Sequence, residues 1–106
     1  MAAYQNEEQI IRDALSAELG DLYAFTRLLV ALTNDPTAEY RSLVAFELMD
    51  RAPEWTIPQL ISIQAAVVAV ASRESKLGVH IRVLKLLTII ITVEMHERIG
   101  GSAPHN

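Results

Sequence analysis

The chain contains no cysteine, and this absence removes several classes of site at once. Disulfide bonds, thiolate nucleophiles and zinc or iron–sulfur centres held by cysteine are all excluded. A protein without disulfides fits a reducing compartment most simply. The sequence therefore predicts a cytoplasmic protein.

Glycine and aromatic residues are also scarce. The four glycines, at positions 20, 78, 100 and 101, do not form the glycine-rich loop that cradles a phosphate. Apolar residues make up 51% of the chain but aromatic residues only 6%, so Leu, Ile, Val and Ala have to build the core. That composition favours helices packed on helices, and 106 residues are enough for one core.

No apolar segment is long enough to cross a bilayer. The longest uncharged run, 55–72, contains Thr56, Pro58, Gln59, Ser62 and Gln64, and its apolar part, 60–71, is too short. The first eight residues do not place a basic segment before an apolar one, as a secretory signal does. The sequence predicts neither a membrane span nor export.

Residues that perform catalysis are poorly grouped. No Gly-x-Ser-x-Gly elbow presents a serine nucleophile. His80 and Glu94 share one face of a predicted helix, but the rise per residue puts them about 21 Å apart. Glu94, His96 and Glu97 point in different directions, and no second histidine completes a helical zinc motif. We therefore predict no cofactor, no metal and no enzymatic activity.

What the sequence does contain is helical periodicity. Asn6 suits an N-cap, with Glu7 and Glu8 in the first turn. Seven apolar residues then fall on one stripe without a change of phase: Ile11, Leu15, Leu19, Leu22, Phe25, Leu29 and Leu32. This pattern predicts one continuous helix over about 7–33. The alternative is two helices separated by a turn at Gly20 and Asp21.

Three further helices follow from cap signals. Asp35 as N-cap and Pro36 in the first turn predict a helix to about residue 50, followed by a short connection over 51–54. Thr56 and Gln59 match a capping box, and Trp55 and Leu60 stand at the positions of a hydrophobic staple, which predicts a helix over 57–75. After Gly78, a last helix over 79–99 ends at the two terminal glycines.

Two other patterns bear on these helices. The β-branched run 88–93 would suit a strand by propensity, but it keeps the apolar phase of a helix, so we assign it as helical. Three acid–base pairs have the favourable spacing of four residues: Glu8 with Arg12, Glu47 with Arg51, and Glu94 with Arg98.

These elements predict an all-α protein, a small bundle of four to five helices. We expect residues 1–101 to form one domain and 102–106 to form a disordered tail. The two C-terminal helices carry more apolar residues than the others, so we expect them to form a central apolar hairpin.

The apolar excess of the two C-terminal helices also suggests a contact surface. A helix that is apolar on nearly all sides is either central in its fold or covered by a partner. Small side chains on the 57–75 helix would let a second helix approach closely. The candidate self-association residues are Ser62, Ala65, Ala69, Ile89 and Val93.

Basic residues cluster around Gly78, whereas the chain as a whole is acidic. Residues 1–55 carry a net charge of −6 and residues 56–106 carry +2. The cluster could contact an anion or another partner, and it comprises Arg73, Lys76, His80, Arg82 and Lys85. Four bases and a histidine fall short of the footprint of a nucleic-acid binder, so a solvated helix connection is the preferred interpretation.

The sequence therefore favours a non-catalytic protein-interaction module, such as an adaptor, regulator or inhibitor, that forms a homodimer. A nucleic-acid-associated regulator that uses the basic cluster is the alternative. An enzyme with a site assembled across a dimer, with Glu47 or His80 as acid or base, is the third hypothesis, although Arg51 is placed to pair with Glu47.

Overall fold

The computed structural model describes residues 4–73 and 79–101, and within them every regular element is a helix. Their order is α1 (Glu7–Glu18), α2 (Leu22–Asn34), α3 (Ala38–Asp50), the 3-10 helix η1 (Ala52–Glu54), α4 (Ile57–Ala71) and α5 (Val79–Gly101). The all-α prediction is confirmed. The disordered tail over 102–106 lies outside the described residues.

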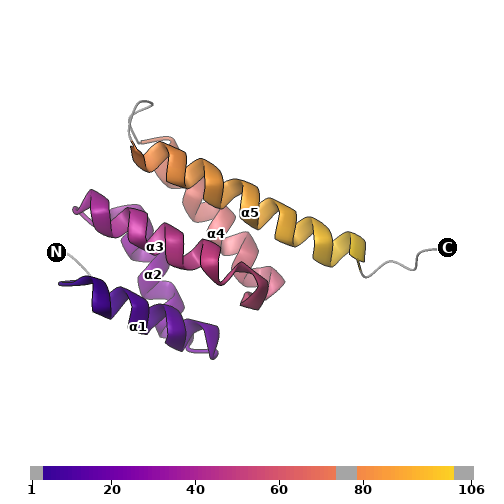
Figure 1. Cartoon of the computed structure of the whole chain (residues 1–106), viewed down its shortest axis with the longest axis horizontal. Coiled ribbons are helices and arrows are strands. Elements are labelled where there is room, and N and C mark those ends of the chain that lie inside the picture. The colour runs from indigo at the N-terminus through magenta and orange to yellow at the C-terminus, as the bar shows by residue number, and fades with distance from the viewer. Residues whose placement is uncertain (1–3, 74–78, 102–106) are drawn as a thin grey trace.

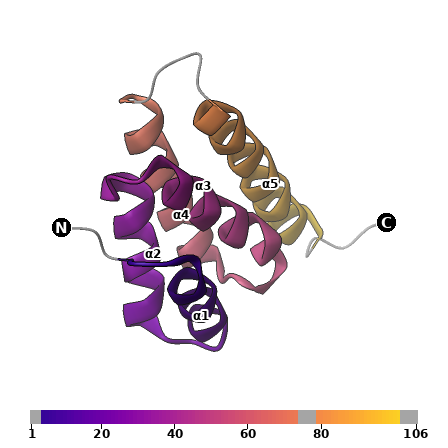
Figure 2. The ribbon, with the colours of Figure 1, turned by 60° about the vertical axis from the view of Figure 1, so that its left-hand side comes forward.

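The helices form two layers. In Figure 1, α1, α3 and α5 lie in front and run in roughly one direction, while α2 and α4 lie behind them and run in the other. Figure 2 shows the same two layers from the side. Helix α3 packs on α1, α2 and α5, whereas α5 packs on α3, α4 and η1 at one edge of the front layer. The structure therefore does not confirm a central position for the α4–α5 hairpin.

The prediction of a continuous first helix is wrong, because the chain turns at Gly20. This glycine has a φ of +107°, a backbone conformation that residues with a Cβ atom rarely adopt. The carboxylate of Asp21 then caps α2 by accepting hydrogen bonds from Tyr23 N (2.9 Å) and Ala24 N (3.1 Å). The turn lets α1 fold back on α2, which one straight helix could not do.

The turn also changes which residues of α1 face the core. Ile10, Ala14 and Ala17 are buried, while Ile11 and Leu15 of the predicted stripe, one position after Ile10 and Ala14, are exposed. Beyond the turn, Phe25 and Leu32 of α2 are buried as predicted. The predicted stripe therefore faces the core only from Phe25 onward, whereas Ile11, Leu15, Leu19 and Leu22 are exposed.

The cap of α3 also differs from the prediction. Helix α2 continues to Asn34, so Asp35 ends it, with its N–H bonded to Ala31 O (2.9 Å). The Asp35 carboxylate accepts a hydrogen bond from Thr37 N (2.8 Å), and Thr37 is the N-cap residue, without a side-chain bond of its own. Asp35 thus shapes the turn between two helices instead of capping the second.

The start of α4 is as predicted. Thr56 Oγ1 accepts a hydrogen bond from Gln59 N (3.3 Å), and Gln59 Oε1 accepts one from Thr56 N (2.8 Å), which completes the capping box. Trp55 and Leu60, the staple residues, are both buried. Helix α4 ends at Ala71, before the predicted residue 75, and the run 88–93 is helical as predicted.

The core lies where the two layers meet. Its largest fully buried side chains come from every α-helix and from the segment before α4: Ile10, Leu28, Leu32, Val44, Leu48, Trp55, Leu60, Ile63, Leu87 and Ile91. The Trp55 ring lies 5.4 Å from that of Phe25, and its Nε1 donates to Leu48 O (2.9 Å), so its polar atom is satisfied. Among the described residues, no helix is both long and apolar enough to span a bilayer.

Candidate functional site

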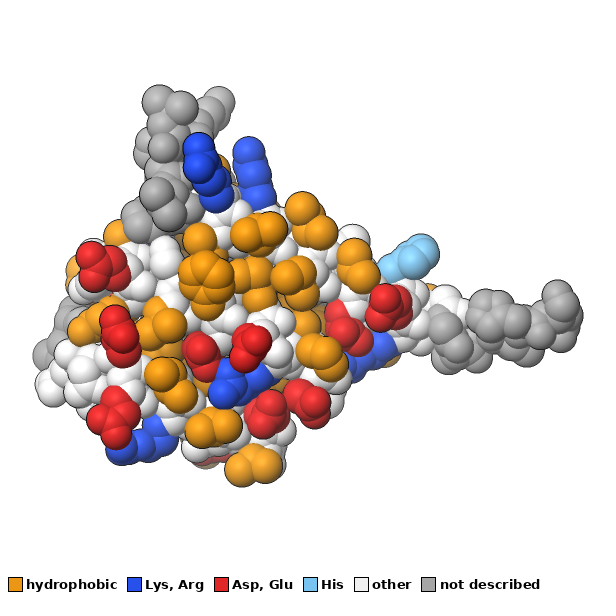
Figure 3. Space-filling model, in the orientation of Figure 1, with side chains coloured by type: hydrophobic (Ala, Val, Ile, Leu, Met, Phe, Trp, Pro, Cys, Tyr) orange, Lys and Arg blue, Asp and Glu red, His pale blue; other side chains and the backbone are white. Residues whose placement is uncertain are grey.

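The front layer carries an open apolar groove between α3 and α5, with a volume of about 670 Å³. Its apolar lining comes from α3, α5 and the segment around η1: Phe46, Met49, Ala52, Pro53, Leu86, Ile89, Ile90 and Val93. Figure 3 shows hydrophobic side chains gathered over this part of the molecule. The groove therefore presents a surface suited to an apolar partner.

The lining is unusual because five of its large apolar side chains are exposed to solvent. Phe46 is 50% exposed and Ile89 58% exposed, and Leu86, Ile90 and Val93 are exposed as well. Helix α3 places Val44 and Leu48 in the core and Phe46 on a different side, so both faces of this helix are apolar. Helix α5 likewise buries Leu87 and Ile91 and leaves Ile89 and Val93 outside.

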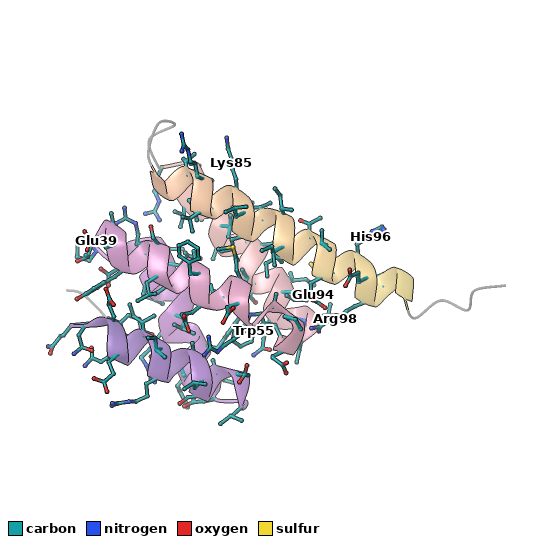
Figure 4. The ribbon with its side chains drawn as sticks, viewed as in Figure 1. Glu39, Trp55, Lys85, Glu94, His96 and Arg98 are labelled. Atoms are coloured by element: carbon teal, nitrogen blue, oxygen red, sulfur yellow. The ribbon has the colours of Figure 1, made fainter. Side chains whose placement is uncertain are left out.

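One end of the groove is acidic. Asp50 and Glu97 are exposed there, and among the described residues neither forms an ion pair. Glu94 also lines this end, but Arg98 Nε binds its carboxylate (3.1 Å). Figure 4 shows Glu94 and Arg98 near the C-terminal end of α5, and Lys85 toward the opposite end of that helix. The groove thus has carboxylates at the end where α3 and α5 finish, and Lys85 lies toward the opposite end of α5.

The structure divides the predicted self-association residues between two surfaces. Ile89 and Val93 line the groove. Ser62, Ala65 and Ala69 are exposed on α4, and none of them lines it. The α4 stripe and the groove are therefore separate surfaces.

The predicted basic cluster is only partly described. Arg82 and Lys85 are exposed on α5, whereas Lys76 and the side chain of His80 lie outside the described part of the chain. Arg73 donates from Nε to Ala69 O (3.3 Å) and from Nη2 to Thr33 O, so its guanidinium joins the ends of α2 and α4. Arg73 therefore has a structural role in addition to its charge.

A smaller polar hollow of about 280 Å³ lies beside Arg73. Arg41 Nη1 donates there to the carbonyl oxygen of Asp35 (2.7 Å). The Asp35 carboxylate is buried, and its Oδ2 atom has no hydrogen-bond partner among the described residues. Arg41 and Arg73 donate hydrogen bonds to backbone carbonyl oxygens on either side of the hollow. These bonds connect the end of α2 to α3 and α4.

Glu47, the carboxylate considered for acid–base chemistry, is bound to Arg51. Arg51 Nη1 donates to Glu47 Oε1, and Arg51 Nε lies 3.8 Å from Glu18 Oε1 of α1. These three partly buried groups connect the C-terminal ends of α1 and α3. Within the described residues, no three His, Asp or Glu side chains group as a metal site would require.

Sequence reasoning did not find the α3 side of the groove. Phe46 supplies an exposed aromatic ring, and Asp50 and Glu97 supply the acidic end. The available signal was the presence of apolar residues on two sides of 38–50, which is typical of a helix that needs two partners.

No family model, no characterised protein and no solved structure matches the chain.

Proposed function

We propose that the protein is a non-catalytic interaction module that binds a second copy of itself through the α3–α5 groove and the adjoining face of α5. The supporting observation is that five exposed apolar side chains line the same groove: Phe46, Leu86, Ile89, Ile90 and Val93. A second copy is the occupant we favour, because the same face offers both basic and acidic groups for pairing.

Simple energetics give the expected affinity. Each of these five side chains is already about half buried, so covering the rest contributes about 1 kcal/mol. Two copies then gain roughly 10 kcal/mol, against a cost of association of at least about 4 kcal/mol. With the smallest of these costs, the difference of about 6 kcal/mol corresponds to a dissociation constant in the range of tens of micromolar. We therefore expect a reversible dimer that depends on concentration.

Light scattering over a range of concentrations tests the proposal. The wild-type protein should shift from monomer to dimer between about 1 and about 300 μM. Ile89→Glu places a charge in the middle of the face and should keep the protein monomeric. Val68→Glu is the matched control, because Val68 is 70% exposed on α4, close in the helix to Ala65 and Ala69. Helical circular dichroism should be the same in all three proteins.

Two results would contradict the proposal. A wild-type protein that stays monomeric at the highest concentration has no self-association to explain. Dissociation by Val68→Glu but not by Ile89→Glu would place the contact on the small-residue stripe of α4 instead of the groove.

A further inference from the structure

The outward face of α5 has a charge order that suits one orientation of a second copy. Arg82, Leu86, Ile89, Val93 and Glu97 follow one another at intervals of four, three, four and four residues, which keeps them on one stripe of the helix. All five are exposed. The stripe thus has a cation at its first position, a carboxylate at its last, and only apolar side chains between them.

The spacing of the two charges fixes where a symmetry axis would fall. Fifteen residues separate Arg82 from Glu97, which corresponds to about 22 Å along the helix. The midpoint lies between Ile89 and Ile90. A twofold axis through this midpoint, perpendicular to the helix, brings Arg82 of one copy opposite Glu97 of the other and Leu86 opposite Val93. A parallel arrangement would instead set each charge against its own kind.

We infer that two copies pair through antiparallel α5 helices, with Arg82 of each copy bound to Glu97 of the other. This inference rests on the proposed function and adds the orientation and register of the contact. Among the described residues, neither Arg82 nor Glu97 has an ion-pair partner within its own chain, so both are available to a second copy. Asp50 beside Glu97 and Lys85 near Arg82 have the signs that reinforce the two pairs.

Charge exchange tests the pairing. Arg82→Glu and Glu97→Arg each change both symmetry-related pairs at once, because the interface uses the same patch twice. Each variant should weaken the dimer about tenfold, and the double variant should return to within about threefold of wild type. Arg12→Glu is the control, since Arg12 is exposed on α1 and should leave the affinity unchanged.

Crosslinking tests the orientation directly, because the chain has no cysteine of its own. In an antiparallel dimer, a mixture of Arg82→Cys and Glu97→Cys proteins should form a disulfide between the two variants, while Arg82→Cys alone should not link to itself. Ile90→Cys, near the axis, should link to itself under mild oxidation.

The outcomes separate this inference from the proposed function. If the protein dimerises but Arg82→Cys links to itself, the helices are parallel and the inference fails while the proposed function stands. If the dimer persists but the mixed pair does not link, or the double charge variant stays weak, the register is wrong. If no dimer forms at any concentration, both proposals fail.

Discussion

Arg27 of α2 donates two hydrogen bonds to the carboxylate of Asp13 of α1, from Nε to Oδ2 and from Nη2 to Oδ1, each 2.8 Å long. Tyr4 adds a third, from its hydroxyl to Oδ2 (2.6 Å). Hydrogen bonding from Arg27 lowers the pKa of Asp13 by more than burial raises it. Burial, reinforced by the bond to Asp13, raises the pKa of Tyr4, which therefore remains a donor at neutral pH.

This arrangement predicts acid sensitivity. Because the pKa of Asp13 is lower in the folded protein, its contribution to stability is present above the unfolded value of about 3.9 and is lost as the pH falls through the folded value. Asp13→Asn should lower the free energy of unfolding at neutral pH by about 1 kcal/mol, a figure reduced because Arg27 is half exposed. The variant should also lose less stability on acidification than wild type does.

Urea unfolding at neutral and acidic pH, followed by the fluorescence of Trp55, measures both effects. The control is Glu8→Gln, because Glu8 and Arg12 form an ion pair (3.3 Å) whose side chains are 80% and 70% exposed. This substitution should change stability by no more than about 0.5 kcal/mol. An equal loss in the two variants would show that the geometry around Asp13 has no special effect.

Gly20 and Gly100 should respond in opposite ways to the same substitution. Gly20→Ala should destabilise by about 1 kcal/mol, because the left-handed backbone disfavours a Cβ although nothing lies within 4 Å of it. Gly100→Ala, within α5 and also with open space around it, should be neutral or stabilise by up to about 1 kcal/mol. Thermal unfolding of both variants provides the comparison, and a shift of the same sign in both would contradict it.

Two threonine caps offer a second matched pair. Thr56 forms a capping box, whereas Thr37 makes no side-chain cap bond. Thr56→Ala should therefore cost about 1 kcal/mol, and Thr37→Ala only a few tenths. Denaturant midpoints at constant m-value measure the difference. Equal costs would mean that the hydrogen bonds of the box add nothing to stability.

Arg98 joins α5 to the segment before α4. Its guanidinium donates to the carbonyl oxygens of Ala52 (3.2 Å), Pro53 (2.7 Å) and Trp55, in addition to Glu94. Arg98→Lys keeps the charge but lacks the planar fork that reaches several acceptors, so it should cost about 2 kcal/mol. Arg12→Lys, at an exposed position of α1, should leave the free energy of unfolding almost unchanged. If both variants have wild-type unfolding curves, the carbonyl contacts do not contribute to stability.

Local signals in the sequence predicted the elements that depend on local chemistry. The capping box of Thr56 and Gln59 and the ion pairs at a spacing of four residues are properties of neighbouring residues, and the structure contains them. The break at Gly20 was the less favoured alternative because apolar phase continues across it. Only the packing of α1 against α2 and α3 decides in favour of the turn, and no single stripe encodes that packing.

The groove shows the same limit. Ile89 and Val93 could be chosen from the apolar excess of α5, but their neighbour Phe46 lies more than forty positions away and is brought beside them by the tertiary fold. The small residues Ser62, Ala65 and Ala69 share a helix face, yet the fold places that face apart from the groove. Periodicity tells which residues share a face of one helix, and it does not tell which faces of different helices meet.

The burial pattern of α1 indicates which helix detaches first when the protein unfolds. Its three buried residues, Ile10, Ala14 and Ala17, include a single large side chain, so releasing this helix exposes little apolar surface. Polar contacts also retain this helix, such as the hydrogen bonds of Asp13 with Arg27. Protonation of carboxylates should therefore detach α1 first, in a sub-global opening visible as early amide exchange, while α2 to α5 stay assembled.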